Sequence, residues 1–222
     1  MAGGYRKVSD LPALVPVFPL DGALLLPGCQ LPLQIFEPRY VALVNDCVRS
    51  EVPRFGVVLI ARGREVGGGD ERYEVGALAH IAECVNLGAE RYALHCLMGE
   101  RIKVCDWLPD EPYPRATVRL WPDEPGDPVT GSQLLDIDDR VMALFERVAA
   151  ARDARPPSRD QVLGRQRPED IGKRLYALAS RLPLGPADRY AVLSAPSPAE
   201  RLAALNEAVD SVAAMIEFQL SE

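Results

Sequence analysis

The sequence of 222 residues contains no apolar run long enough to cross a membrane. A transmembrane helix needs roughly 18 or more apolar residues in succession, and prolines or charged residues interrupt every shorter run here. The opening residues, Met-Ala-Gly-Gly-Tyr-Arg-Lys, are not followed by the apolar core of a signal peptide. We therefore expect a cytoplasmic protein with no membrane partner.

The sequence also lacks the cysteine pairs of a disulfide framework or a zinc site. Its five cysteines are scattered with no Cys-x-x-Cys pair, at Cys29, Cys47, Cys84, Cys96 and Cys105. Such a pattern indicates reduced thiols, mostly buried. A formal net charge of −7 repels phosphate backbones, so nucleic acid is not an expected partner.

Motifs for nucleotide binding and for nucleophilic catalysis are missing. A P-loop requires Gly-x-x-x-x-Gly-Lys-Ser/Thr, but the only Gly-Lys, Gly172-Lys173, lacks the upstream glycine and precedes Arg174. Ser180 lies two helical turns beyond Lys173, about 10 Å along a helix, which is too far for a Ser-Lys dyad. The sequence therefore predicts no enzyme, no cofactor and no metal.

Proline is abundant near the start of the chain. Five prolines divide the segment from Val15 to Tyr40 into short apolar runs, at Pro16, Pro19, Pro27, Pro32 and Pro38. Because proline donates no backbone hydrogen bond, it stands at strand edges and turns. The segment predicts short extended pieces that enter a strongly curved sheet.

The region from Val15 to about Leu120 is rich in strand signals. One helix is expected over 38–50, and strands are expected over 55–60, 73–85, 91–98, 100–108 and 113–121, with Gly99 separating two of them. Many short strands punctuated by glycine and proline predict a small closed or nearly closed barrel.

Beyond Trp121 the apolar spacing becomes helical. The proline-rich, acidic run 122–128 begins a linker, and helices are expected from Leu134, from Ile171, around 186–193 and from Pro198, the last with a Ser197–Glu200 capping box. We expect four parts: a tail over 1–14, a barrel over 15–121, a linker over 122–133 and a helical subdomain over 134–222. The stretch 152–168 is predicted to be a mobile loop.

Several segments, in this order, resemble the N-terminal domain of the Lon protease family. They are Pro32-Leu-Gln-Ile-Phe-Glu-Pro-Arg-Tyr40, Phe55-Gly-Val-Val-Leu59, Tyr73–Ile81, Gly99-Glu-Arg-Ile-Lys-Val104, Leu182-Pro-Leu184 and Ser197-x-x-Glu-Arg-Leu202. The resemblance covers roughly Val15–Leu120 and Ile171–Leu220. It departs from the family at Asp188-Arg-Tyr190, where Lys-Gln is frequent.

The resemblance implies an α+β fold, with a PUA-like β-barrel followed by an α-helical bundle. It implies a free-standing member of the family, without ATPase or protease domains, that binds unfolded or misfolded polypeptide segments. Such a module would serve protein quality control as an adaptor or chaperone-like factor, presenting bound proteins to a separate protease. The barrel face that docks other Lon modules could alternatively form a homodimer.

Binding an unfolded segment requires exposed apolar area or an open strand edge. The candidates near the proline-rich entrance are Phe18, Leu25, Leu26 and Phe36, and each of them could equally belong to the core. The Glu37-Pro-Arg-Tyr40 segment is interpreted as an ion pair and an anchor for the first helix.

Two other functions remain open. A small metal-dependent hydrolase would use His80, Cys84 and His95 on the barrel, although no ligand spacing supports it. An RNA-binding PUA-like protein would use the locally basic loop, with Arg152, Arg155, Arg159, Arg165 and Arg167.

Overall fold

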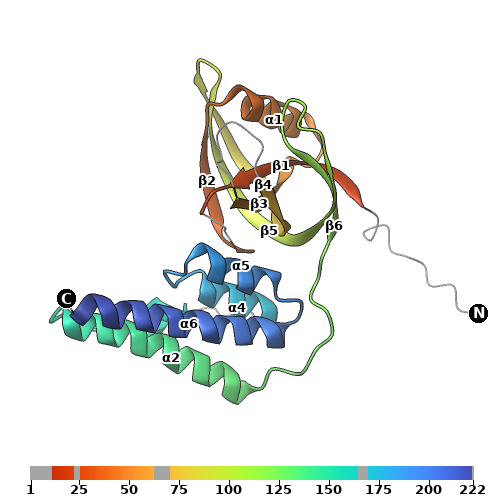
Figure 1. The fold of residues 1–222 in the computed structure, drawn as a ribbon. Helices are drawn as coiled ribbons and strands as arrows, with labels where there is room; N and C mark the ends of the chain where they lie inside the picture. The colour runs from red at the N-terminus through yellow and green to blue at the C-terminus, as the bar shows by residue number, and fades with distance from the viewer. Residues whose placement is uncertain (1–11, 23–25, 63–70, 165–169, 222) are drawn as a thin grey trace, which may run out of the picture. The chain divides into compact units, whose positions relative to one another are not determined.

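The computed structural model describes residues 12–22, 26–62, 71–164 and 170–221. The chain divides between Pro122 and Asp123 into two compact units. The first unit contains one helix, α1 (Pro38–Arg49), and a sheet drawn in red to green in Figure 1. Its strands are β1 (Ala13–Leu20), β2 (Gln30–Ile35), β3 (Arg54–Arg62), β4 (Glu71–Gly88), β5 (Arg91–Leu108) and β6 (Arg115–Leu120).

Five of these strands close into a barrel. The sheet order is β2-β5-β4-β3-β1-β6, and an additional pairing of β6 with β5 completes the ring. Closure is possible because β5 pairs with β2 through residues 92–97 and with β6 through residues 102–108. The predicted barrel is confirmed, and β2 lies outside the ring as an edge strand.

The crossover from β1 to β3 explains the first helix. These two strands are parallel, with Val17 opposite Gly56, and parallel neighbours need a long connection. In this chain, the connection contains β2 and α1, which lies across one end of the barrel (Figure 1). Pro38 occupies the start of α1, where its missing N–H costs nothing. Tyr40 and Val44 are buried as expected, whereas Val48 is exposed.

The prediction of two strands separated at Gly99 is wrong, because β5 runs without interruption through this residue. Glycine is needed there because the His80 ring lies close to the backbone, and not because the chain turns. A Cβ atom at Gly99 would lie 2.6 Å from the His80 ring, which packs over the strand. A local glycine signal could not distinguish these two uses.

The second unit consists of helices. They are α2 (Gly131–Ala151), α3 (Arg159–Leu163), α4 (Ile171–Ala179), α5 (Pro186–Ser194) and α6 (Pro198–Ser221). The long helices α2 and α6 lie side by side and run in the same direction (Figure 1). Ion pairs join them, from Arg140 to Asp210 and from Arg147 to Glu217.

The stretch predicted as a mobile loop contains the ordered helix α3. Ser158 accepts a hydrogen bond from the Gln161 N–H, and the Gln161 side chain accepts one from the Ser158 N–H. This capping box and the buried side chains of Val162 and Leu163 hold the short helix against the unit. The many arginines and prolines of the stretch obscured that signal.

The predicted α+β class is confirmed by the six-stranded sheet and the helices of the second unit. Across the described parts of the chain, every helix is too short or too polar to cross a membrane.

We expect the Tyr113→Phe variant to reveal a pH-dependent contact between α1 and the barrel. The buried Tyr113 hydroxyl donates to Asp46 Oδ2 at 2.7 Å, and this hydrogen bond, with one from Arg49, lowers the pKa of Asp46. A bond to a carboxylate contributes about 1–2 kcal/mol. Folding lowers the pKa of Asp46, so the hydrogen bond from Tyr113 stabilises the folded state fully at pH values above the pKa of Asp46 in the unfolded chain. This stabilisation is lost as the pH falls through the pKa of Asp46 in the folded protein.

Urea titrations at pH 7 and pH 3, followed by tryptophan fluorescence, measure this difference, because Trp107 and Trp121 both belong to the barrel unit. The control is Tyr92→Phe, which removes a 2.9 Å hydrogen bond to the uncharged Asn45 side chain. Its effect on the free energy of unfolding should not depend on pH. Equal pH dependence in the two variants would contradict the prediction.

Candidate functional site

Phe18 and Leu26, two of the residues predicted to bind peptide, are buried. Phe18 is 4% exposed and its ring centroid lies 4.2 Å from that of Tyr40, while Leu26 is fully buried. Neither side chain offers apolar surface in this conformation, and Phe18 packs with Tyr40 of α1 and Phe55 of β3 in one core cluster. Leu25 lies outside the described residues. The candidate surface therefore narrows to Phe36, which is 66% exposed.

Phe36 follows directly after β2 and has exposed apolar neighbours in the adjoining strands. Ile35 pairs with Tyr92 of β5, which pairs with Asn86 of β4. Alternate side chains point to the same face of a sheet, and burial shows that the inner face holds Ile35 and Leu94. Three exposed residues of the opposite face, Phe36, Val85 and Leu87, form what we call the outer apolar patch.

The histidines and cysteines considered for a metal site do not converge. His80 Nε2 lies 3.0 Å from Glu100 Oε2, and the pKa of Glu100 is lowered by its own backbone N–H and by this contact. Burial raises the pKa of the Cys96 thiol to about 12. Among the residues that the structure describes, no group of three or more His, Cys, Asp or Glu side chains is placed to hold a metal ion.

Charged side chains that seemed noteworthy in the sequence make structural ion pairs. Arg39 Nε donates to Glu37 Oε2 at 3.1 Å, as expected for the start of α1. In the basic stretch, Arg159 pairs with Asp139 at 2.6 Å, while Arg165 and Arg167 lie outside the described residues. RNA binding remains an untested hypothesis.

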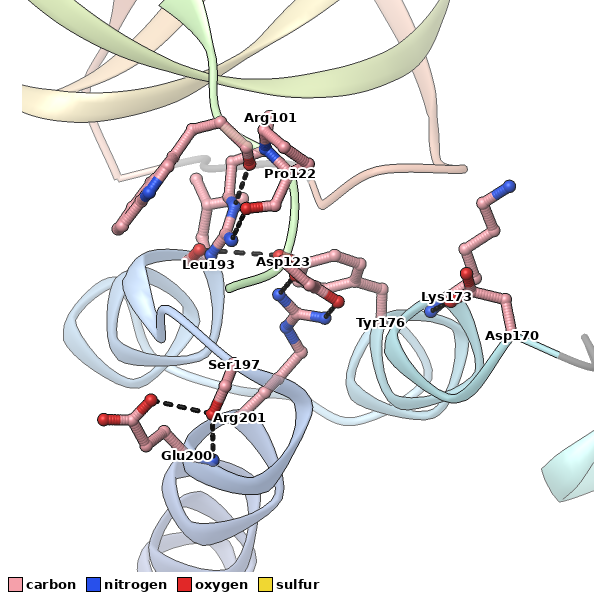
Figure 2. Close-up of polar contacts among 11 residues, drawn as sticks. Arg101, Pro122, Asp123, Asp170, Lys173, Tyr176, Leu193, Ser197, Glu200 and Arg201 are labelled. Carbon is pink, nitrogen blue, oxygen red and sulfur yellow. Dashed lines mark hydrogen bonds and ion pairs between the residues drawn. The ribbon is translucent and has the colours of Figure 1, made fainter. Parts of the chain in front are cut away.

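A buried arginine organises the second unit, as Figure 2 shows. The Arg201 side chain of α6 is fully buried, and its guanidinium binds both carboxylate oxygens of Asp123, at 2.9 and 2.5 Å. The guanidinium carbon also lies 3.9 Å from the centroid of the Tyr176 ring of α4. One side chain thus joins α4, α6 and the segment that precedes α2.

The same segment is held at the start of α6. Glu124 N–H donates to the Pro196 carbonyl at 2.9 Å, and Gly126 packs so closely on Ser197 that a Cβ atom would lie 2.7 Å from its hydroxyl. Ser197 caps α6 as expected, accepting from the Glu200 N–H and donating to the Glu200 carboxylate. The predicted linker therefore packs as part of the helical unit from Asp123 onward.

In the barrel unit, Arg101 holds the chain just before the division. Its Nε donates to the Trp121 carbonyl at 3.0 Å, and its guanidinium carbon lies 4.1 Å from the centroid of the Trp121 ring. Each unit thus uses its own buried arginine to fix one end of the connection. Such planar, multidentate contacts suit arginine and not lysine.

Residues 14–211 match the sequence model of the ATP-dependent protease La (LON) substrate-binding domain. The chain belongs to the LON substrate-binding domain family. Among curated relatives, it is 33% identical to a Lon protease of Anaeromyxobacter dehalogenans over 110 residues, which cover 49% of this chain and 13% of the relative. It is 28% identical to Lon protease 1 of Herpetosiphon aurantiacus over 214 residues, or 91% of this chain and 25% of the relative.

Two solved structures share the LON-domain fold. The Lon N-terminal domain protein from Xanthomonas campestris superposes with a TM-score of 0.62 at 24% identity, covering 88% of this chain and 98% of that one. The N-terminal domain of a Mycobacterium avium complex Lon protease gives 0.61 at 18% identity, covering 89% and 98%. The chain therefore corresponds in extent to these isolated domains, and it spans a quarter or less of the two curated relatives described above.

Sequence reasoning did not single out the two buried arginines of this LON domain. Both lay within segments that carried the resemblance, Gly99-Glu-Arg101 and Glu200-Arg201, but nothing local marked them as buried. The position of Arg201 next to Leu202, within the apolar stripe of a predicted helix, was the one signal that could have indicated its burial. Asp138 of α2 is also buried, and it pairs with Arg174 at 2.8 Å.

We expect the Gly172→Ala variant to be destabilised, although alanine is the better helix former. A Cβ atom at Gly172 would contact the Asp123 carboxylate and lie 2.6 Å from Arg201 Nη1. Displacing the ion pair should cost about 1–3 kcal/mol, instead of the gain of about 0.5–1 kcal/mol usual for this substitution. Urea unfolding followed by helical circular dichroism measures the change.

The matched control is Gly131→Ala at the start of α2, where a Cβ atom would meet open space. This variant should unfold within about 0.5 kcal/mol of the parent or be slightly more stable. If the two variants had the same stability, Arg201 and Asp123 would not form a close-packed pair beside Gly172.

Proposed function

We propose that this chain recognises unfolded or misfolded polypeptide segments for protein quality control and does not itself catalyse a reaction. The observation that carries the proposal is the family match, which extends over residues 14–211 and concerns a substrate-binding domain. The sequence supports it, since it contains no P-loop motif and the candidate pair of Lys173 and Ser180 is separated by two helical turns.

The outer apolar patch supports the same proposal. Unfolded chains expose apolar side chains, and a surface that captures them must itself expose apolar area. Phe36 is 66% exposed, and Val85 and Leu87 are 44% and 49% exposed. These side chains follow β2 or belong to β4, and they take no part in the buried core.

In the proposed role, the chain is an adaptor that passes a bound protein to a separate protease in the cytoplasm. The aligned residues cover 13% and 25% of two relatives named Lon protease, and the proposal assigns cleavage to a different polypeptide chain. Its free thiols suit a reducing compartment. A homodimer through the barrel face is an alternative use of the same surface.

Binding to a permanently unfolded protein, such as reduced carboxymethylated α-lactalbumin, tests the proposal. We expect the full chain to bind this probe and not the folded protein, and to show neither ATP hydrolysis nor casein cleavage. The Phe36→Ala variant should bind the unfolded probe at least about fivefold more weakly, because one exposed aromatic contact contributes about 1 kcal/mol or more. Fluorescence anisotropy measures the dissociation constants.

Phe218→Ala is the matched control, since Phe218 of α6 is 67% exposed and lies in the other unit. It should bind like the parent. Equal losses in both variants would show that Phe36 is not part of the binding surface. Failure of the parent chain to bind the unfolded probe, or casein cleavage by the chain alone, would refute the proposed function.

A further inference from the structure

The free edge of β2 has a defined set of outward main-chain groups. Met98 N–H donates to the Cys29 carbonyl at 2.9 Å, and the β2–β5 register continues this pairing with Gln30 opposite Leu97. In an antiparallel ladder, residues that bond to the partner strand alternate with residues that face away. Leu31, Leu33 and Ile35 therefore bond to β5, and the groups of Gln30, Pro32 and Gln34 point away from it.

The position of Pro32 is consistent with this alternation, because proline has no N–H to donate and Pro32 is one of the residues that do not bond to β5. The side chains of Gln30, Pro32 and Gln34 are all exposed. Among the described residues, β2 pairs with no strand other than β5. The edge thus offers two N–H groups, of Gln30 and Gln34, and three carbonyl groups, of Gln30, Pro32 and Gln34.

From this edge we infer that β2 binds an extended segment of another polypeptide by adding it to the sheet as an antiparallel strand. Only an extended main chain presents donors and acceptors at the spacing of these groups. The inference rests on the proposed function and assigns it a place and a mode of binding. The added strand would lie beside the outer apolar patch, with Phe36 at the end of β2.

Pro32 argues against a second copy of this chain as the occupant. When two copies of β2 pair antiparallel through their outward groups, Gln30 faces Gln34 and Pro32 faces Pro32, and at the proline pair two carbonyl groups meet with no N–H between them. An edge proline is a known defence against such self-pairing. A different segment that carries N–H groups throughout satisfies the Pro32 carbonyl, so the edge favours a foreign strand free of proline.

The side chains beside the edge indicate the chemistry of that strand. Leu33 is half-buried and packs on the barrel core at the open side of β2, so an added strand gains burial by placing an apolar side chain next to it. Gln30 and Gln34 carry no charge on the opposite face. The expected ligand is therefore an uncharged, apolar, extended segment, which is typical of the interior of an unfolded protein.

A capped peptide of about eight residues that alternates valine and threonine is a suitable probe. We expect the full chain to bind it, and we expect N-methylation of single peptide nitrogens to weaken binding only at every second position. That period arises because alternate N–H groups of the added strand face β2. If N-methylation weakened peptide binding equally at every position, or at no position, the inference would be overturned.

Gln34→Pro removes an outward N–H of β2 without removing a bond to β5, and Gln34→Ala is the control that keeps this N–H. Loss of one hydrogen bond should weaken peptide binding at least about fivefold in the proline variant only. Tryptophan emission and the melting temperature verify that the barrel is folded. If both variants bind the peptide equally, the inference is wrong.

Carboxymethylated α-lactalbumin separates this inference from the proposed function. A Gln34→Pro variant that binds this protein as well as the parent does would overturn strand addition and leave substrate recognition intact. A parent chain that binds neither probe would refute both.

Discussion

The hydrogen bonding of β5 to three different strands is the constraint on which the barrel unit depends. It pairs with β4 through residues 91–103, with β2 through residues 92–97 and with β6 through residues 102–108. The pairing with β6 closes the ring, and the pairing with β2 places a short strand outside it. A closed barrel has no free edge of its own, so β2 supplies the open edge of the described sheet. The same strand therefore fixes the core and creates the edge that we propose for binding.

A buried ion pair has the corresponding role in the helical unit. Arg201 is fully buried between α4 and α6, and it fixes Asp123 at the beginning of the unit. An arginine in this position would be costly without its partner, because a buried charge must be compensated. The planar guanidinium satisfies that need by binding two carboxylate oxygens and by stacking on Tyr176. The absence of a side chain at Gly172 leaves the room for this arrangement.

Local signals in the sequence predicted most elements well. The helical spacing of Leu202, Leu205 and Val209 and the Ser197 cap located α6. A short β-branched run located β3, and the alternation of apolar and polar residues located β4 and β6. Errors arose where one local signal has two structural meanings. Gly99 indicated a turn but serves a close approach of His80, and the arginines and prolines before α3 indicated mobility although Ser158 caps a helix there.

The sequence by itself determined the α+β class, the division near Pro122 and the membership suggested by ordered family motifs, because these depend on local periodicity and composition. Only the tertiary structure decided which apolar residues of the Val15–Tyr40 segment are available for binding. Phe18 and Phe36 are alike in sequence context, yet one packs on Tyr40 and the other is exposed. The difference comes from strand pairing between residues 39 to 67 positions apart in the chain, which buries Phe18 in the core beside α1 and leaves Phe36 exposed.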